Sequence, residues 1–336
     1  MINLTNLLIN LCKIEKVSGD ESTISKFLQE LLAPLCKEII ITQNNSVIAK
    51  FSNSKNNSKE VILTAHLDEI GFLVKEITEN GFLKIENCGR TNLNLTDFQI
   101  VEVHGARKLT GFSFITNEAQ NEQSKELLIN LGLKKQEVEK VVKAGDRVNF
   151  KFNPIILNDN KFCSKSLDDS AGVASILLAI NKINLLNLNC NLTVIFSSQE
   201  ETSSNGIITS SNFCNADVAI CVDVTFAKFL GCDVAGINEM TKGPAIGVSP
   251  ILDLNLTKKL QKIAIENKIT HQLEIMNEKT STDADKIVKT NKGIKTCLIS
   301  IPIKYMHSPI EQVALIDILN TSELIVKFIE SIYNKG

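Results

Sequence analysis

Five short segments of the chain place histidine, aspartate or glutamate directly after runs of apolar residues. They contain His66 and Asp68, Asp168-Asp169, Glu200-Glu201, Asp223, and His307. Carboxylates that converge in one place repel one another unless protons or cations neutralise them. Imidazole and carboxylate ligands suit Zn, Co or Mn, and two such ions about 3.5–4 Å apart form the usual two-metal hydrolytic arrangement. These residue types therefore indicate a hydrolytic site with two divalent cations.

Each segment taken alone also has an ordinary structural explanation. A His-x-Asp sequence after a strand is usually a hydrogen-bonded turn, and Asp168-Asp169 before a helix is typical of an N-cap. Glu200-Glu201 is compatible with a solvated loop, and His307 with a structural histidine. Asp223 fits such explanations less well, because a lone carboxylate that closes an apolar strand needs a partner. The coincidence of five such segments at strand ends favours the functional interpretation.

The apolar runs in front of these segments predict strands that are buried on both faces of a sheet. They cover residues 61–65, 192–196, 218–222 and 296–301. Helical spacing of apolar residues recurs over residues 4–11, 24–32, 170–183, 255–267 and 315–332. Alternation of strands and helices predicts an α/β fold, with a mixed, largely parallel sheet flanked by helices. Ligands collect at the carboxyl ends of the strands in such sheets, so the five segments can converge.

A different pattern occupies residues 71–157. Short alternating runs predict β-strands over residues 72–77, 82–85, 99–103, 111–115 and 147–152, and Glu79-Asn80-Gly81 is a turn signal. The length of 336 residues also favours two domains. We therefore predict an α/β catalytic domain formed by residues 1–70 and 158–336, with a β-rich domain inserted at residues 71–157. His104 within the insertion is predicted to be structural or exposed rather than catalytic.

The composition limits which binding partners and which cellular compartment we expect for the protein. A formal net charge of −2 without a dense basic run gives no reason to expect binding to nucleic acid or to a membrane surface. The nine cysteines form no CxxC motif and are odd in number, which favours reduced thiols in the cytoplasm. The first residues lack a basic flank and a cleavage site, and no apolar run reaches the length of a membrane span.

Beyond these patterns, the sequence resembles metallopeptidase family 42, which includes tetrahedral aminopeptidases, glutamyl and deblocking aminopeptidases, and members labelled endoglucanase. The resemblance rests on the blocks AHLDEIGFLV, LDDSAGVA, QEE, VDVT and YMHSPIE, which occur in the family's order across almost the whole chain. It implies an aminopeptidase that hydrolyses N-terminal residues from short peptides. It also implies that the inserted domain mediates dimerisation, with the dimer as building block of a homo-oligomer, up to a twelve-subunit particle.

The resemblance further implies a role for each site residue. His66 would bind the first metal together with Asp223, and Asp68 would orient His66. Asp168 would bridge the two metals, followed by a strained peptide bond to Asp169, and His307 and Glu201 would complete the ligand set. Glu200 would be the general base that takes a proton from a water shared by the metals. Two divalent ions per subunit are implied, Zn in preference to Co or Mn, and Asp283 has a weakly supported role in substrate binding.

Three positions depart from the family's pattern. Ser170 and Lys304 each stand where the family usually has arginine, and residues 202–206 replace a loop that often carries another arginine. A lysine cannot reproduce the bidentate fork of a guanidinium. These departures keep two alternatives open. One is a hydrolase of another amide or of a glycoside, and the other is a catalytically weak relative that acts in assembly or peptide binding.

Overall fold

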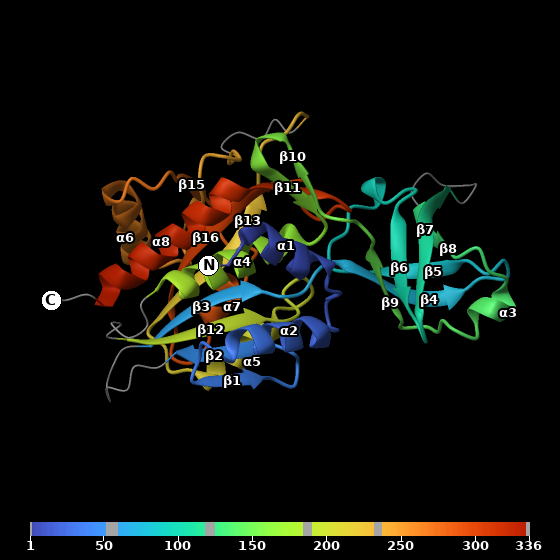
Figure 1. The fold of residues 1–336 in the computed structure, drawn as a ribbon, viewed down its shortest axis with the longest axis horizontal. Helices are drawn as coiled ribbons and strands as arrows, with labels where there is room; N and C mark the ends of the chain where they lie inside the picture. Colours follow the sequence, from blue (N-terminus) through green and yellow to red (C-terminus); the bar gives the residue numbers. More distant parts are fainter. Residues whose placement is uncertain (1, 52–59, 118–124, 184–189, 232–236, 334–336) are drawn as a thin grey trace.

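The computed structural model describes residues 2–51, 60–117, 125–183, 190–231 and 237–333. The chain forms two β-structures, a large sheet flanked by helices and a smaller closed barrel beside it (Figure 1). The strands of the large sheet come from the segments before Gly71 and after Phe150, whereas the barrel strands all come from the segment between these two residues. This arrangement confirms the predicted fold class.

Four parallel strands form the centre of the large sheet. In spatial order they are β12 (Asn191–Ser197), β3 (Glu60–His66), β13 (Val218–Phe226) and β16 (Lys295–Lys304). Antiparallel strands extend both sides: β1 (Glu38–Ile41) and β2 (Val47–Phe51) beside β12, and β17 (Glu311–Ala314), β11 (Lys161–Ser164) and β10 (Ile155–Leu157) beyond β16. Strand β14 (Ala245–Val248) pairs with β16 and with β15 (Gln272–Ile275). The carboxyl ends of the four central strands therefore meet along one edge.

Helices cover both faces of this sheet because successive side chains of a strand point to opposite faces. Leu63 of β3 packs in the larger core cluster, whereas its neighbour Ile62 packs in the cluster on the other face. The first face carries α1 (Leu4–Lys13), α2 (Ser22–Leu32), α4 (Leu167–Lys182), α6 (Leu254–Glu266) and α8 (Leu315–Tyr333). The second carries α5 (Asn205–Ser210) and α7 (Ala284–Ile287). No helix in the described part of the chain is long and apolar enough to cross a bilayer.

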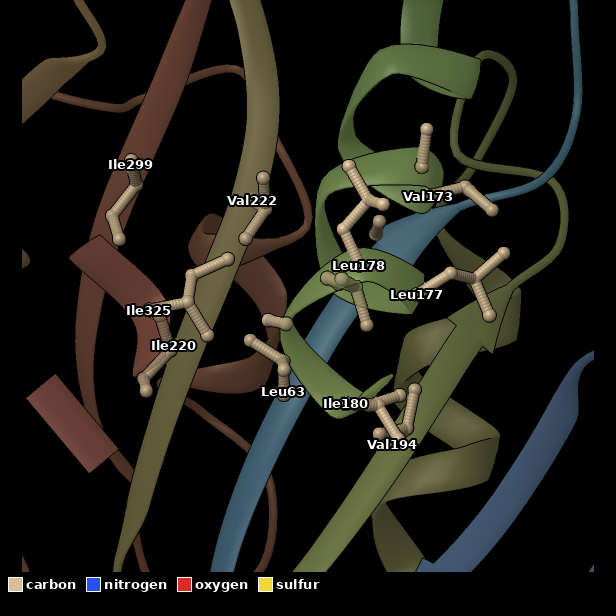
Figure 2. Packing of buried hydrophobic residues seen from close by; sticks show 14 of the residues in the cluster. Leu63, Val173, Leu177, Leu178, Ile180, Val194, Ile220, Val222, Ile299 and Ile325 are labelled. Carbon is tan, nitrogen blue, oxygen red and sulfur yellow. The ribbon is translucent and has the colours of Figure 1, made fainter. Parts of the chain in front are cut away.

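Helix α4 lies in the middle of the first face and is buried from Leu167 to Ile180. Figure 2 shows Ile180 of this helix beside Val194 of β12, and Val173, Leu177 and Leu178 belong to the same core cluster as Leu63 and Val222. A helix that is apolar on all sides belongs inside the protein, so its position is fixed by packing on the strands below and on α8 and α1 above. The residues at its N-terminus are consequently held in place relative to the sheet.

The barrel is closed by six strands and has a core of its own. Its strands are β4 (Gly71–Ile77), β5 (Leu83–Cys88), β8 (Lys125–Asn130), β7 (Lys108–Asn117), β6 (Ile100–His104) and β9 (Arg147–Phe150), with α3 (Lys135–Val138) and the short 3-10 turn Leu93–Leu95 alongside. Phe72 packs edge-on against Phe150 at a centroid distance of 5.4 Å. Strand pairing returns to the large sheet at β10, which starts at Ile155. The predicted domain limits and the dimerisation role of the insertion stay predictions.

Candidate functional site

The predicted site residues meet at the carboxyl ends of the central strands. His66 is the last residue of β3, Glu200 and Glu201 follow β12, and His307 follows β16. Asp168 lies at the start of α4 and completes the group from the helical layer. Asp223 does not close its strand, as the sequence had suggested, because β13 continues to Phe226. Its pairing with β3 stops at Cys221 and only β16 accompanies it further; the register places Asp223 level with His66, the last residue of β3.

The Asp168 carboxylate stands between the two histidines. Its Oδ1 lies 2.9 Å from Nε2 of His66, and its Oδ2 lies 3.1 Å from Nε2 of His307. The backbone that presents this carboxylate is unusual, with Ser166 at a φ of 52° and a cis peptide bond between Asp168 and Asp169. Each carboxylate oxygen thus faces a different imidazole, which is the geometry required of a ligand that bridges two centres.

Glu201 and Asp223 extend the group on either side of Asp168. Glu201 Oε2 lies 3.4 Å from His307 Nε2, and Asp223 Oδ1 lies 3.9 Å from His66 Nε2. Ligand atoms of His66, Asp168 and Glu201 all lie within 4.8 Å of one another. The same holds for a second group formed by His66, Asp169 and Asp223. The five predicted metal ligands are therefore neighbours in the folded chain.

Asp68 supports this group without facing its centre. The Asp68 carboxylate is fully buried, and its Oδ1 lies 3.5 Å from Nδ1 of His66, on the side of the ring opposite Asp168. It also accepts the backbone N–H of Glu200 at 2.9 Å and that of Glu201 at 3.1 Å. One side chain thus fixes the end of β3 relative to the loop after β12.

The electrostatics of the group show an excess of buried negative charge. Burial raises the pKa of Asp223 well above its usual value, and the neighbouring charge of Asp169 raises it further. Burial and the charge of Asp168 likewise raise the pKa of Glu201. Burial opposes ionisation of Asp168, but hydrogen bonds from His307 and His66 outweigh it and keep the pKa of Asp168 below its usual range. Added positive charge would offset this repulsion and favour the ionised form of these carboxyl groups.

The set of candidate ligand atoms fits divalent cations. Oε1 of Glu201 is buried and has no hydrogen-bond partner. Unpaired buried polar atoms are costly, and buried charges are normally paired or coordinate a metal. Carboxylate oxygens with imidazole nitrogens and no thiolate match Zn, Co or Mn. The residues present therefore suit the metal centre that the sequence predicts.

A cavity of about 530 Å³ opens onto this group. Its wall includes Asp168, Glu200, Glu201, Asp223 and His307 from the site, Arg90 from the barrel side, and residues 279–282, 285 and 286. Asp283 is not part of this wall: it is buried, its Oδ2 accepts the hydroxyl of Ser197, and burial raises its pKa to about 7. Thr282 and Asp285, on either side of Asp283 in the sequence, line the cavity, and the substrate-binding role of Asp283 stays a prediction.

Sequence reasoning missed one residue that organises the site. The buried Glu311 carboxylate accepts the N–H of Asp168 at 3.1 Å and the N–H of His307 at 2.9 Å. It belongs to the block YMHSPIE, four residues after His307, and an acidic residue so close to a candidate ligand was the available signal. Asp169 was noted only as a neighbour, yet its carboxylate accepts the N–H of His66 at 3.3 Å and that of Gly172 at 2.9 Å.

Comparison with known proteins adds independent findings. Residues 45–324 match the family described as M42 glutamyl aminopeptidase. The lysyl aminopeptidase of Pyrococcus furiosus is 26% identical over 94% of each chain. The solved aminopeptidase APDkam598 of Desulfurococcus kamchatkensis superposes with a TM-score of 0.89 at 29% identity, covering 98% of this chain and 94% of its own. The TET1 peptidase of Pyrococcus horikoshii, described as assembling into a tetrahedron or an octahedral shell, gives 0.84 at 26% identity over 97% and 98%.

Proposed function

Because the chain belongs to the M42 glutamyl aminopeptidase family, whose members are metal-dependent hydrolases, we propose that it is a dinuclear aminopeptidase acting on short peptides. The observation that carries the proposal is the Asp168 carboxylate, whose two oxygens face His66 and His307 at 2.9 and 3.1 Å. A carboxylate placed between two imidazoles and flanked by further acids is what a pair of cations requires. The cavity of about 530 Å³ at this point leaves room for a short peptide.

The chain offers a ligand set for each of two cations. His66 and Asp223 would hold one ion, His307 and Glu201 the other, and Asp168 would bridge them, with Zn favoured over Co or Mn. When bound, such ions polarise a scissile carbonyl and make a nearby water more acidic. Asp68 keeps the His66 ring oriented, since a carboxylate beside the second ring nitrogen fixes the position of the imidazole.

Glu200 is the proposed proton carrier. Its side chain lines the cavity, while its backbone N–H is held by Asp68 at 2.9 Å. Burial raises the pKa of Glu200 well above its usual value, and the charge of Asp223 adds to the effect, although His66 opposes it. A carboxyl group with a raised pKa can accept the proton of the attacking water and donate it to the leaving amine. Glu200 would thus serve as base and then as acid.

A metal titration combined with a substrate panel tests this proposal. We expect about two divalent ions per chain, hydrolysis of peptides with a free N-terminus, and no hydrolysis of N-acetylated peptides or carboxymethylcellulose. Glu200→Gln keeps the size of the side chain but removes the base, so kcat should fall by roughly 10²–10⁴ while metal content is retained. Glu30→Gln, an exposed carboxyl on α2, is the matched control.

Three results would contradict the proposal in different ways. Hydrolysis of blocked peptides alone would exclude an aminopeptidase. Cleavage of the polysaccharide would favour a glycoside substrate for the same ligands. Two bound ions without turnover of any substrate would favour the assembly or peptide-binding alternative, which the departures at Ser170, Lys304 and residues 202–206 motivate.

A further inference from the structure

A buried lysine from outside the site reaches the first turn of α4. Lys16 follows α1, and its residue is only 2% exposed. Its Nζ donates to the Ser170 hydroxyl at 2.5 Å and to the carbonyl oxygen of Leu11 at 3.3 Å. Ser170 is equally buried and directly follows Asp168 and Asp169. The lysine therefore contacts the segment that presents the central carboxylate.

This lysine differs from the other buried lysine nearby. Lys165 is neutralised by Glu69, whose two carboxylate oxygens lie 2.6 and 2.5 Å from its Nζ. Lys16 has no such partner: among the described residues no carboxylate lies within ion-pair distance of its Nζ. Burial accordingly lowers the pKa of Lys16. A buried amine with two neutral acceptors contributes little to stability, since its desolvation is costly.

The backbone around Lys16 is hydrogen-bonded to the segment that follows His66 and Asp68. Its carbonyl oxygen accepts the N–H of Glu69 at 2.9 Å, and the Glu69 carbonyl accepts the N–H of Ser18 at 3.1 Å. Glu69 directly follows Asp68. Residues 16–18 are thus attached through their backbone to the Asp68 segment and through the Lys16 side chain to the Asp168 segment.

We propose that Lys16 is a positioning residue for the metal centre, fixing Ser170 and with it Asp168 and Asp169 relative to His66 and Asp68. The inference rests on the proposed function, because it concerns the ligands of that centre. Residues that orient metal ligands typically contribute about 10–100-fold to metal affinity or activity. Lys16 would act in this way through a hydrogen bond, without touching metal or substrate.

The test is metal affinity, measured by competition with a chromogenic chelator, together with the rise in Tm on metal addition. Lys16→Met keeps the length of the side chain and removes the donor. We expect it to bind the metal about 10-fold more weakly and to show a smaller metal-induced rise in Tm, with an unchanged or higher Tm in the metal-free state. Lys13→Met makes the same change at an exposed position of α1 and should alter neither quantity.

Ser170→Ala provides a second variant that removes the acceptor and keeps the lysine. Its effect on affinity should not add to that of Lys16→Met in the double variant, because both remove one contact. Unchanged affinity in Lys16→Met would overturn the inference. Tighter binding would overturn it too, since it would show that the lysine acts only as a repelling charge. If Lys16→Met does not fold, the Ser170→Ala variant decides instead. Metal affinity equal to that of the wild type in Ser170→Ala would then overturn the inference. A wild-type protein that binds no metal would refute the proposed function as well.

Discussion

Asp68 contacts two parts of the proposed site through a single buried carboxylate. One oxygen lies near the His66 ring and accepts the N–H of Glu200, and the other accepts the N–H of Glu201. The side chain therefore sets the distance between a proposed metal ligand, the proposed base and a second ligand. Asp68 can play this part because both of its carboxylate oxygens accept hydrogen bonds. A side chain of the same shape with only one such oxygen would lose one of these contacts.

Asp68→Asn is the variant that isolates this role. The amide retains one oxygen but turns an NH2 group toward a backbone N–H, and an unpaired buried donor costs about 1–3 kcal/mol. We expect kcat/KM and metal affinity to fall by about 10–100-fold. Peptide hydrolysis and chelator competition measure the two effects. Asp20→Asn, at an exposed position, is the control, and a fully active Asp68→Asn enzyme would refute the positioning role.

At the scale of elements, the start of α4 depends on a glycine. The N–H of Gly172 donates to Asp169 Oδ1, so the Asp169 carboxylate lies directly over the helix backbone. A Cβ at position 172 would lie 2.3 Å from Oδ1 and 2.4 Å from Oδ2 of Asp169. Only a residue without a side chain leaves room for this carboxylate beside the helix N-terminus.

Gly172→Ala should therefore destabilise the protein, although alanine normally stabilises a helix interior relative to glycine. Overpacking of this kind costs about 1–3 kcal/mol, which chemical denaturation of the metal-free protein would detect. In an Asp169→Ala background the same change should cost less, because the clashing oxygens are gone. A Gly172→Ala protein more stable than the wild type would disprove the close approach.

The sequence predicted elements well where a local pattern suffices. The apolar runs at residues 61–65 and 192–196 are the interiors of β3 and β12. The sequence did not predict β10, β11, β14, β15 or β17, which have three or four residues each. Strands this short are determined by the neighbours they pair with, which a single sequence does not display. The extension of β13 past Asp223 has the same cause, since β16 continues beside it.

Within the site, the residues were predictable but their contacts were not. The position of His66 at the end of an apolar run indicates that it is a candidate metal ligand. The acceptor role of Glu311 for two backbone N–H groups arises only when β17 and the start of α4 lie side by side. Lys16 is similar: its sequence neighbourhood carries no signal, because its partner Ser170 is 154 residues away.

At the scale of the whole molecule, charged residues connect the barrel to the large sheet's helical layer. Glu15, after α1, contacts His104 at the end of β6 with its Oε2 3.2 Å from Nδ1, and Nε2 of His104 lies 2.7 Å from Asn149 Oδ1. Lys108 pairs with both Glu15 and Glu102. Lys151 also pairs with Glu102. Arg147 lines a small cavity together with Glu15 and His104. Of the two roles left open by the sequence, structural or exposed, these contacts support the structural one, and His104 joins the two β-structures.

The pH dependence of this contact follows from the two pKa shifts. Burial alone would raise the pKa of Glu15, but hydrogen bonds with His104, Glu102 and Lys108 lower it from 4.5 to about 2. Burial would lower the pKa of His104, but hydrogen bonds with Glu15 and Asn149 raise it above 6.5. The stabilisation from Glu15 is therefore lost as pH falls from 4.5 to about 2. The stabilisation from His104 is lost as pH rises above 6.5 through its raised value.

Glu15→Gln tests this link between the two β-structures. Removing the carboxylate leaves His104 half-buried without its charged partner, so its pKa should fall from the raised value toward or below 6.5. An NMR titration of the His104 imidazole measures this shift directly, with Glu30→Gln as the control. The difference in unfolding free energy between wild type and Glu15→Gln should be largest between about pH 4.5 and 6.5, where both groups are charged. An unchanged His104 pKa would show that Glu15 does not hold the barrel through this residue, leaving Lys108 and Glu102 to account for the contact.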